Sequence, residues 1–195
     1  MYRLITKIIE NTRQRIYTKR RKRFASFFNL SSAHSLLDIS CGNGDELRAL
    51  HIAAPNIQFH GIDMSKSCIN KAKEKYPWCS FTVGLAEALP YGKSRFDAIL
   101  SCMALHHYQK PVEVYKEVAR VMSLGGSFYI IDTIPSGRIF QWLYNLDACD
   151  EPYHFERYCT EYDIQKFAES AGLYVTSIVP MRKFDSTKIV TLRKL

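Results

Sequence analysis

Residues 36–44 read LLDISCGNG, and this stretch predicts the fold of the chain. It opens as an apolar run that contains one aspartate, which is typical of a buried strand. In the small-residue loop that follows, Gly42 and Gly44 indicate a backbone with positive φ, or a surface that a large ligand approaches closely. An adenine nucleoside at the mouth of a parallel sheet is one such ligand. Because glycine pairs occur in many turns, this interpretation depends on the rest of the chain.

Length and composition indicate about one globular domain with a substantial core. Of the 195 residues, 47% are hydrophobic and 24% are charged, as in ordinary soluble proteins. No window has the ~18 consecutive apolar residues of a membrane span, and the first residues do not read as a secretory signal. The six cysteines show no CxxC or His-paired spacing, so we expect reduced thiols in a cytoplasmic protein and no metal site.

The net charge of +8 is concentrated in residues 1–24, which hold nine Lys or Arg and one acid. The other 18 basic and 18 acidic residues balance each other. Apolar residues recur at helical spacing here, so we expect residues 1–30 to form a basic amphipathic helix. Four interpretations stay open: a terminal helix that packs its apolar side on the domain and serves as a lid, a peripheral membrane contact, a transit peptide and an RNA contact. The neutral body makes RNA a less favoured partner.

Beyond residue 30, strand-like and helix-like segments alternate. Strand patterns cover residues 35–40, 57–64, 80–84, 96–103 and 126–132. Helix patterns cover residues 45–54, 65–76 and 112–122, and Gly125-Gly126 is expected to separate the last helix from the next strand. This alternation predicts βαβ units, and therefore a parallel sheet with helices on both faces.

The C-terminal segment has a different pattern. A helix is expected over residues 161–172, followed by strands over 173–181 and 188–195 that a short polar turn connects. Such a pair predicts an antiparallel hairpin at the edge of the sheet. Residues 133–160 lack a clean period, and we interpret them as an insertion in a single domain of residues 31–195. The predicted fold class is α/β, doubly wound and mostly parallel.

The carboxyl ends of the predicted strands carry the residues of a nucleoside site, because ligands of such sheets lie beyond those ends. Asp63 ends the second strand, 25 residues after Asp38, where a carboxylate can accept hydrogen bonds from two ribose hydroxyls. A dinucleotide is disfavoured, because Leu47 replaces the third glycine of the dinucleotide fingerprint. The acids Asp45 and Glu46 at the start of the next helix would also repel a pyrophosphate.

The segments LLDISCGNG, GIDMS, AEALPYGKSRFDAILSCMALHH, EVARVMSLGG and FYIID occur in this order between about residues 35 and 135. In this combination the chain resembles the class I S-adenosylmethionine-dependent methyltransferases. It is most similar to their small-molecule branch, which includes quinone-biosynthesis enzymes. The resemblance implies a seven-stranded sheet with a reversed last hairpin, and S-adenosylmethionine as the methyl donor.

The resemblance also implies roles at the methionine and ribose parts of the cofactor. Asp38, Gly42 and Gly44 would frame the methionine half, and Asp63 would hold the ribose hydroxyls. Ser40 stands where the family usually has glycine, so its side chain is expected either to crowd or to hydrogen-bond the methionine amine.

At the adenine and the sulfonium, the implied residues come from the ends of the next strands. Met64 would lie against the adenine, and the backbone N–H of Ala86 would meet the edge of its ring. Leu85 stands where an aspartate often accepts the adenine amino group; the loss of that bond would cost about 1 kcal/mol. Ser101 and Met103 would lie near the sulfonium.

A base is needed only if the acceptor must lose a proton. The candidates are His154, His107 and Asp132, all near the expected acceptor end of the sheet. Against these roles, the adjacent His106-His107 pair is often structural in the family, and Asp132 could simply cap a turn. Apolar residues of the insertion, among them Trp142, fit either an acceptor pocket or ordinary packing.

The sequence therefore predicts a cytoplasmic methyltransferase that acts on a small, apolar or aromatic acceptor by in-line displacement. Two alternatives stay open. One is an RNA-modifying methyltransferase that grips phosphates with residues 1–24, and the other is a protein that binds S-adenosylmethionine without catalysis.

Overall fold

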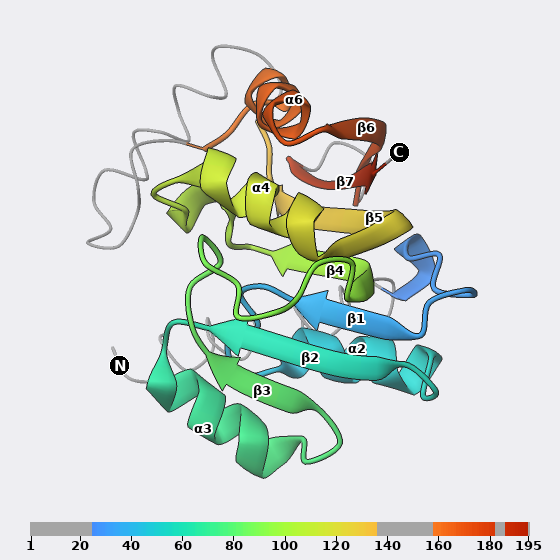
Figure 1. Cartoon of the computed structure of the whole chain (residues 1–195), viewed down its shortest axis with the longest axis vertical. Coiled ribbons are helices and arrows are strands. Elements are labelled where there is room, and N and C mark those ends of the chain that lie inside the picture. The colour runs from blue at the N-terminus through green and yellow to red at the C-terminus, as the bar shows by residue number, and fades with distance from the viewer. Residues whose placement is uncertain (1–24, 136–157, 182–185, 195) are drawn as a thin grey trace, which may run out of the picture.

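The computed structural model of the protein describes residues 25–135, 158–181 and 186–194. Within them, seven strands form one sheet in the order β3-β2-β1-β4-β5-β7-β6 (Figure 1). The parallel part consists of β1 (Ser35–Asp38), β2 (Gln58–Asp63), β3 (Ser80–Val83), β4 (Phe96–Cys102) and β5 (Met122–Thr133). This order reverses direction at β1, between β2 and β4, which is where such sheets bind their ligands.

The C-terminal strands form the predicted hairpin. Strand β7 (Thr187–Lys194) lies between β5 and β6 (Leu173–Pro180), and it is antiparallel to both. The predicted fold class, a doubly wound and mostly parallel sheet with an antiparallel C-terminal hairpin, is confirmed.

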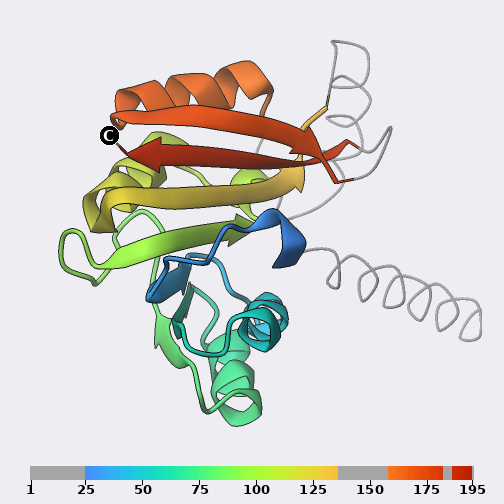
Figure 2. The ribbon, with the colours of Figure 1, turned by 90° about the vertical axis from the view of Figure 1, so that its right-hand side faces the viewer.

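Helices cover both faces of the sheet. α2 (Asp45–Ala53) and α3 (Lys66–Lys75) pack on one face, and α4 (Pro111–Val121) and α6 (Glu161–Ser170) on the other; Figure 2 shows α2 and α4 on opposite sides. The alternation of side chains along β1 explains this arrangement. Leu36 belongs to the core with α2 and α3, whereas Leu37 belongs to the core with α4 and α6. Both leucines are fully buried.

One predicted boundary is wrong. β5 begins at Met122, before Gly125-Gly126, and α4 ends at Val121. Met122 pairs with Phe96 of β4, and a register shift follows before the pairing resumes at Ala98. Gly125 has a φ of 74° inside this irregular part of the strand, a conformation that glycine adopts without strain. The glycines therefore mark an irregularity within β5 and not the end of the helix.

The helix that follows the insertion is fixed by its first residues. The Thr160 hydroxyl accepts a hydrogen bond from the backbone N–H of Asp163, and the Asp163 carboxylate accepts one from the backbone N–H of Thr160. This reciprocal capping satisfies two donors that would otherwise be unpaired at the start of α6. Residues 1–24 of the N-terminal helix predicted for residues 1–30, and most of the predicted insertion, lie outside the described residues. Among the helices that are described, none has the length and apolar character to cross a membrane.

Candidate cofactor and acceptor site

The carboxyl ends of β1, β2, β3 and β4 point to the same side of the molecule (Figure 1). The loop of residues 39–44 lies at this edge and leads from β1 into α2. Backbone hydrogen bonds attach it to β2, since Cys41 N–H donates to the Ile62 carbonyl at 3.0 Å. Gly42 N–H also donates to Asp63 Oδ2 at 2.8 Å. These two hydrogen bonds therefore fix the loop against the end of β2.

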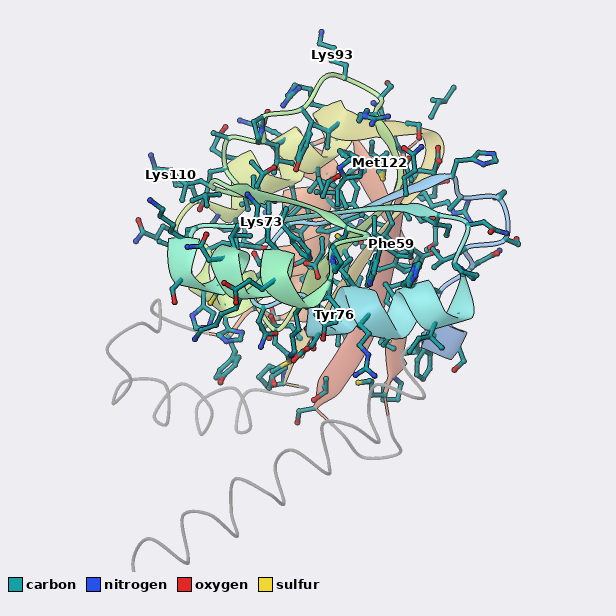
Figure 3. The ribbon with its side chains drawn as sticks, turned by 90° about the horizontal axis from the view of Figure 1, so that it is seen from below. Phe59, Lys73, Tyr76, Lys93, Lys110 and Met122 are labelled. Atoms are coloured by element: carbon teal, nitrogen blue, oxygen red, sulfur yellow. The ribbon has the colours of Figure 1, made fainter. Side chains whose placement is uncertain are left out.

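The two glycines of the loop are there for different reasons. Both have positive φ, 50° for Gly42 and 79° for Gly44. A Cβ added to Gly44 would lie 2.9 Å from the Phe81 ring and 3.0 Å from the ring of Tyr76, the residue that Figure 3 labels where α3 ends. A Cβ added to Gly42 would meet no atom of the described protein within 4 Å. Gly44 is therefore required by packing, whereas Gly42 borders open space that a ligand can fill.

Asp45, at the start of α2, has its own partners in α3. Its Oδ1 accepts hydrogen bonds from the Tyr76 hydroxyl and, at 2.8 Å, from Lys75 Nζ. This carboxylate ties two helices together. It also adds negative charge at the helix start, in agreement with a ligand that carries no phosphate there.

Asp38 is the buried acid of the site, with 1% of its surface exposed. Its Oδ1 accepts from the Ser40 N–H at 3.2 Å, while Oδ2 is buried and has no hydrogen-bond partner among the described residues. Burial, and then the negative charge of Glu46, raises the pKa of Asp38 well above its ordinary value. A buried acceptor without a donor needs an explanation. A cationic amine, such as the ammonium group of the cofactor's methionine end, would satisfy it.

Asp63 is oriented by the backbone for the ribose role. Its Oδ2 accepts from Gly42 N–H, and its Oδ1 accepts from Ser65 N–H at 2.9 Å. Each carboxylate oxygen can accept a second hydrogen bond. The structure thus places an oriented acid beside Gly42, where it is able to receive hydroxyl donors.

Apolar side chains border the site at the ends of β2 and β3. Met64 is 75% exposed and Leu85 is 50% exposed, whereas Ala86 is buried. Exposed apolar side chains at a strand end fit the faces of an aromatic ring such as adenine. Leu85 offers no side-chain acceptor, as its residue type predicts.

At the end of β4, Met103 has a φ of 51°. Its N–H donates to the Ile131 carbonyl of β5 at 2.7 Å, which holds the turn in place. Residues in this strained conformation cluster at ligand sites. Met103 is thus fixed at the edge where the sulfonium is expected.

The sequence analysis missed one residue of the site, Tyr108. Its buried hydroxyl lies 2.9 Å from Ser40 Oγ and 2.8 Å from Ser101 Oγ. Ser40 therefore directs its hydroxyl at a protein group. The only signal in the sequence was that Tyr108 follows the paired histidines; nothing in its spacing indicated a contact with residue 40.

On the acceptor side, Asp132 accepts three hydrogen bonds. They come from Leu105 N–H at 2.8 Å, His106 Nδ1 at 2.8 Å and Thr133 N–H at 2.7 Å. The carboxylate thereby holds the short turn η2 (Leu105–His107) against β5. Because a carboxylate can only accept, His106 Nδ1 carries the proton that is donated to Asp132.

The three predicted base candidates differ in their positions. His107 is exposed, and its ring centroid lies 4.1 Å from that of His106. Among the described residues, Tyr158 also lies beside His106, at 5.2 Å between ring centroids. Asp132 holds η2, as a capping residue would. His154 and Trp142 lie outside the described residues, so their roles stay predictions, as do those of His107 and Asp132. Within the described ranges, no group of three His, Cys, Asp or Glu side chains could hold a metal ion.

The strand order, the glycine loop after β1 and the acid at the end of β2 are the features expected of a Rossmann-like methyltransferase. A family model described as a methyltransferase domain matches residues 30–174. The chain therefore belongs to this family of methyltransferase domains. Membership confirms the predicted enzyme class, a class I methyltransferase, and its cofactor, S-adenosylmethionine.

Curated relatives share part of the chain. The demethylmenaquinone methyltransferase of Thermotoga maritima is 30% identical over 118 residues, which cover 60% of this chain and 52% of that protein. The phthiotriol/phenolphthiotriol dimycocerosates methyltransferase of Mycobacterium leprae is 30% identical over 122 residues, which cover 62% and 45%. The chain thus spans about half the length of these curated relatives.

Solved structures share the fold at low identity. The human N-acetylserotonin methyltransferase in complex with SAM superposes with a TM-score of 0.77 and 16% identity, over 93% of this chain and 53% of that one. An O-methyltransferase from neocarzinostatin biosynthesis has a TM-score of 0.72 and 18% identity, over 88% and 52%. That protein is in complex with S-adenosyl-L-homocysteine and 1,4-dihydroxy-2-naphthoic acid.

Proposed function

We propose that this chain transfers a methyl group from S-adenosylmethionine to a small, apolar or aromatic acceptor by in-line displacement. The observation that carries this proposal is the buried Oδ2 of Asp38, which has no hydrogen-bond partner among the described residues, four residues before the open space at Gly42. An acceptor atom in that position costs the free protein stability, and a ligand with an ammonium group offsets the cost on binding. The site thus offers groups that suit both ends of the cofactor. Acids would suit its amine and its ribose, and apolar side chains would suit its adenine ring.

The acceptor class is inferred from the relatives. Two of them are named for demethylmenaquinone and for phthiotriol or phenolphthiotriol dimycocerosates, and a third structure holds a dihydroxynaphthoic acid. These are apolar or aromatic molecules. For this chain we propose a compound of the same chemical class, such as a quinol with an unsubstituted ring position or a phenol.

Bound S-adenosylmethionine supplies a methyl group activated by its sulfonium. The protein's own residues orient that group and keep water out. Asp38 and the loop at Gly42 would hold the methionine end, and Asp63 would hold the ribose. When the methylated atom carries a proton, a base must take it. We propose two alternative sources for that base. One is the 105–107 turn, where Asp132 orients His106, and the other is the segment that contains His154.

An apolar acceptor of this kind partitions into membranes. The nine Lys or Arg of residues 1–24 would bring the enzyme to an anionic surface, where its acceptor dissolves. Binding to anionic vesicles at low salt, with loss of binding on deletion of residues 1–24, tests this part of the proposal. Binding to RNA and not to vesicles would favour the RNA alternative instead.

Calorimetric titration with S-adenosylmethionine, S-adenosylhomocysteine and NAD tests the cofactor site directly. We expect the first two to bind in the micromolar range and NAD not to bind. A radiolabelled methyl group should then appear on a demethylmenaquinol or phenolic acceptor supplied in vesicles. Binding of NAD in place of the sulfur ligands would overturn the proposal. Binding of the sulfur ligands without turnover on any acceptor would favour the non-catalytic alternative.

A further inference from the structure

The hydroxyl of Tyr108 connects two elements that diverge at the carboxyl edge of the sheet. Tyr108 follows η2, and its side chain is buried with 8% of its surface exposed. Its hydroxyl contacts Ser40 in the loop after β1 and Ser101 in β4, at 2.9 and 2.8 Å. β1 and β4 are the neighbouring strands at which the sheet reverses its order. Tyr108 therefore bridges the two sides of the site with one oxygen.

The direction of these hydrogen bonds follows from counting protons. Ser40 Oγ also lies 2.7 Å from the Ile39 carbonyl, which can only accept, so the Ser40 proton points to Ile39. In its contact with Ser40, Tyr108 must then be the donor. Because Tyr108 has a single proton, Ser101 must donate to Tyr108. Burial raises the pKa of Tyr108 well above its ordinary value, so the hydroxyl keeps that proton.

The chain of donors therefore runs from Ser101 through Tyr108 and Ser40 to the Ile39 carbonyl. Each serine hydroxyl donates its proton to a protein acceptor, so neither can donate a hydrogen bond to a ligand. What remains at Ser101 and Ser40 is acceptor capacity only. A ligand group with N–H donors is favoured beside such oxygens, and an anionic group is disfavoured.

The same bridge fixes the position of the loop. On the β2 side the loop is tied by Cys41 N–H to Ile62 and by Gly42 N–H to Asp63. On the β4 side, Ile39 N–H donates to the Leu100 carbonyl at 2.9 Å where the loop begins, and the bond between Ser40 and Tyr108 adds a side-chain tie one residue further along. Without the Tyr108 hydroxyl, the part of the loop beyond Ile39 would lose this side-chain tie to the β4 side, at the point where it meets a ligand.

We propose that Tyr108 is a positioning residue for the methionine end of the cofactor site, and that it leaves the Ser40 hydroxyl as an acceptor for the cofactor's ammonium group. This inference rests on the proposed function, because it takes S-adenosylmethionine as the ligand. The proposal explains why a serine fits at position 40. The Ser40 hydroxyl donates to the Ile39 carbonyl and accepts from Tyr108, so its proton does not point at the ammonium group of the ligand.

The test compares two ligands that differ only at the methionine end. S-adenosylhomocysteine carries the amino acid part, whereas 5′-methylthioadenosine has the same nucleoside and thioether but no amine or carboxylate. In Tyr108→Phe, which keeps the ring and removes the hydroxyl, we expect the Kd for S-adenosylhomocysteine to rise about tenfold, equivalent to the loss of one charge-assisted hydrogen bond. The Kd for 5′-methylthioadenosine should stay within about twofold.

Tyr115→Phe is the matched control. Tyr115 is fully buried in α4, and its hydroxyl has no hydrogen-bond partner within the described part of the chain. Removal of this hydroxyl should leave both Kd values unchanged. If Tyr108→Phe does not fold, Ser40→Ala interrupts the same chain at a residue that is partly exposed, and it should show the same selective loss for S-adenosylhomocysteine.

A double-mutant cycle sharpens the assignment. In a Ser40→Gly background, Tyr108→Phe should have a smaller effect on the Kd for S-adenosylhomocysteine, since part of its action passes through Ser40. Equal losses for both ligands would mean general distortion of the site and would overturn the inference, as would no loss for either ligand. Failure of the unmodified protein to bind S-adenosylhomocysteine is a different result, and it would overturn the proposed function itself.

Discussion

Two aspartates at the carboxyl edge of the sheet are equally buried and yet differ in every other respect. Asp38 on β1 and Asp132 on β5 are each 1% exposed. Asp132 accepts three hydrogen bonds, whereas Asp38 accepts one and leaves Oδ2 without a partner in the described structure. The β5 side of the edge is thus completed by the protein's own donors, and the β1 side is left for a ligand. Burial alone does not identify a binding residue; the indication at Asp38 is a buried carboxylate oxygen without a donor among the described residues, located at the sheet edge where ligands bind.

The largest expected effect is on the free energy of unfolding, and it comes from a substitution at Asp132 on the β5 side of the edge. In Asp132→Asn, the new amide NH₂ must face backbone or imidazole N–H donors in place of an accepting oxygen. We expect a loss of about 3 kcal/mol in the free energy of unfolding, because buried charge-assisted hydrogen bonds are replaced by opposed donors. Urea unfolding measures it.

Glu113→Gln is the control for that measurement, because its ion pair with Lys116 is exposed and spans one helix turn. That substitution should change the unfolding free energy by less than about 0.5 kcal/mol. If Asp132→Asn were as stable as the control, the structural role assigned to Asp132 would be wrong, and a catalytic role would regain weight.

Gly44 and Gly42 show the same contrast, because Gly44 packs against protein atoms whereas Gly42 borders open space. In Gly44→Ala the new Cβ would have to displace the Phe81 ring, 2.9 Å away, at a positive φ. We expect about 2–3 kcal/mol of destabilisation from strain and overlap together. Gly42→Ala carries only the backbone strain, about 1 kcal/mol. Thermal unfolding of both variants side by side measures this difference.

Ligand binding should reverse the order of the two glycine variants. Relative to its stability loss, Gly42→Ala should weaken S-adenosylhomocysteine more than Gly44→Ala does, because its Cβ enters the open space of the site. Titration at a temperature where both variants are folded separates the two effects. A Gly42→Ala variant that binds the ligand as the unmodified protein does would show that the open space is not part of the site.

On the open side, Asp38→Asn should separate stability from binding. Replacement of a buried carboxylate whose Oδ2 lacks a donor among the described residues should leave the free protein as stable as before or more stable. The Kd for S-adenosylhomocysteine should rise about thirtyfold, equivalent to about 2 kcal/mol for a hydrogen bond between charged groups. The Kd for 5′-methylthioadenosine, which has no amine, is the internal control and should change little. A parallel loss of stability and of both affinities would contradict a ligand-specific role.

The sequence predicted the parts of this contrast that depend on pattern. Short apolar runs between helix-like segments predicted the strands, and the spacing of Asp38 and Asp63 predicted a nucleoside site between them. Pattern could not distinguish Asp38 from Asp132, because both are acids at the end of an apolar strand, and only the three donors around Asp132 separate them.

Two further features also depend on contacts that no local pattern encodes. The start of β5 at Met122 was missed because the apolar spacing of α4 continues into it, and pairing with Phe96 on β4 decides the boundary. The bridge at Tyr108 joins residues 68 positions apart in the chain, so it appears only after the sheet has formed.

The last prediction concerns how the stability of the protein depends on pH through Asp38, on the β1 side of the edge. The pKa of Asp38 is raised in the folded protein by burial and then by Glu46, from an ordinary value of 3.8. A raised pKa means that this residue's contribution to stability is fully present below about pH 3.8 and is lost as pH rises through the folded-state pKa. The stability advantage of Asp38→Asn over the unmodified protein should therefore grow as pH rises and become constant above that pKa.

Binding should depend on the same proton with the opposite sign. An ammonium group pairs with the ionised form of Asp38, so the affinity for S-adenosylhomocysteine should fall, by about threefold or more, as pH is lowered into the range where the free carboxyl is protonated. Near that range, binding should release protons, which titration in buffers of different ionisation enthalpy detects. Asp38→Asn should bind weakly at every pH and release none. Proton release that persists in Asp38→Asn would assign the linkage to another group, and Asp38 would then lose its place as the partner of the amine.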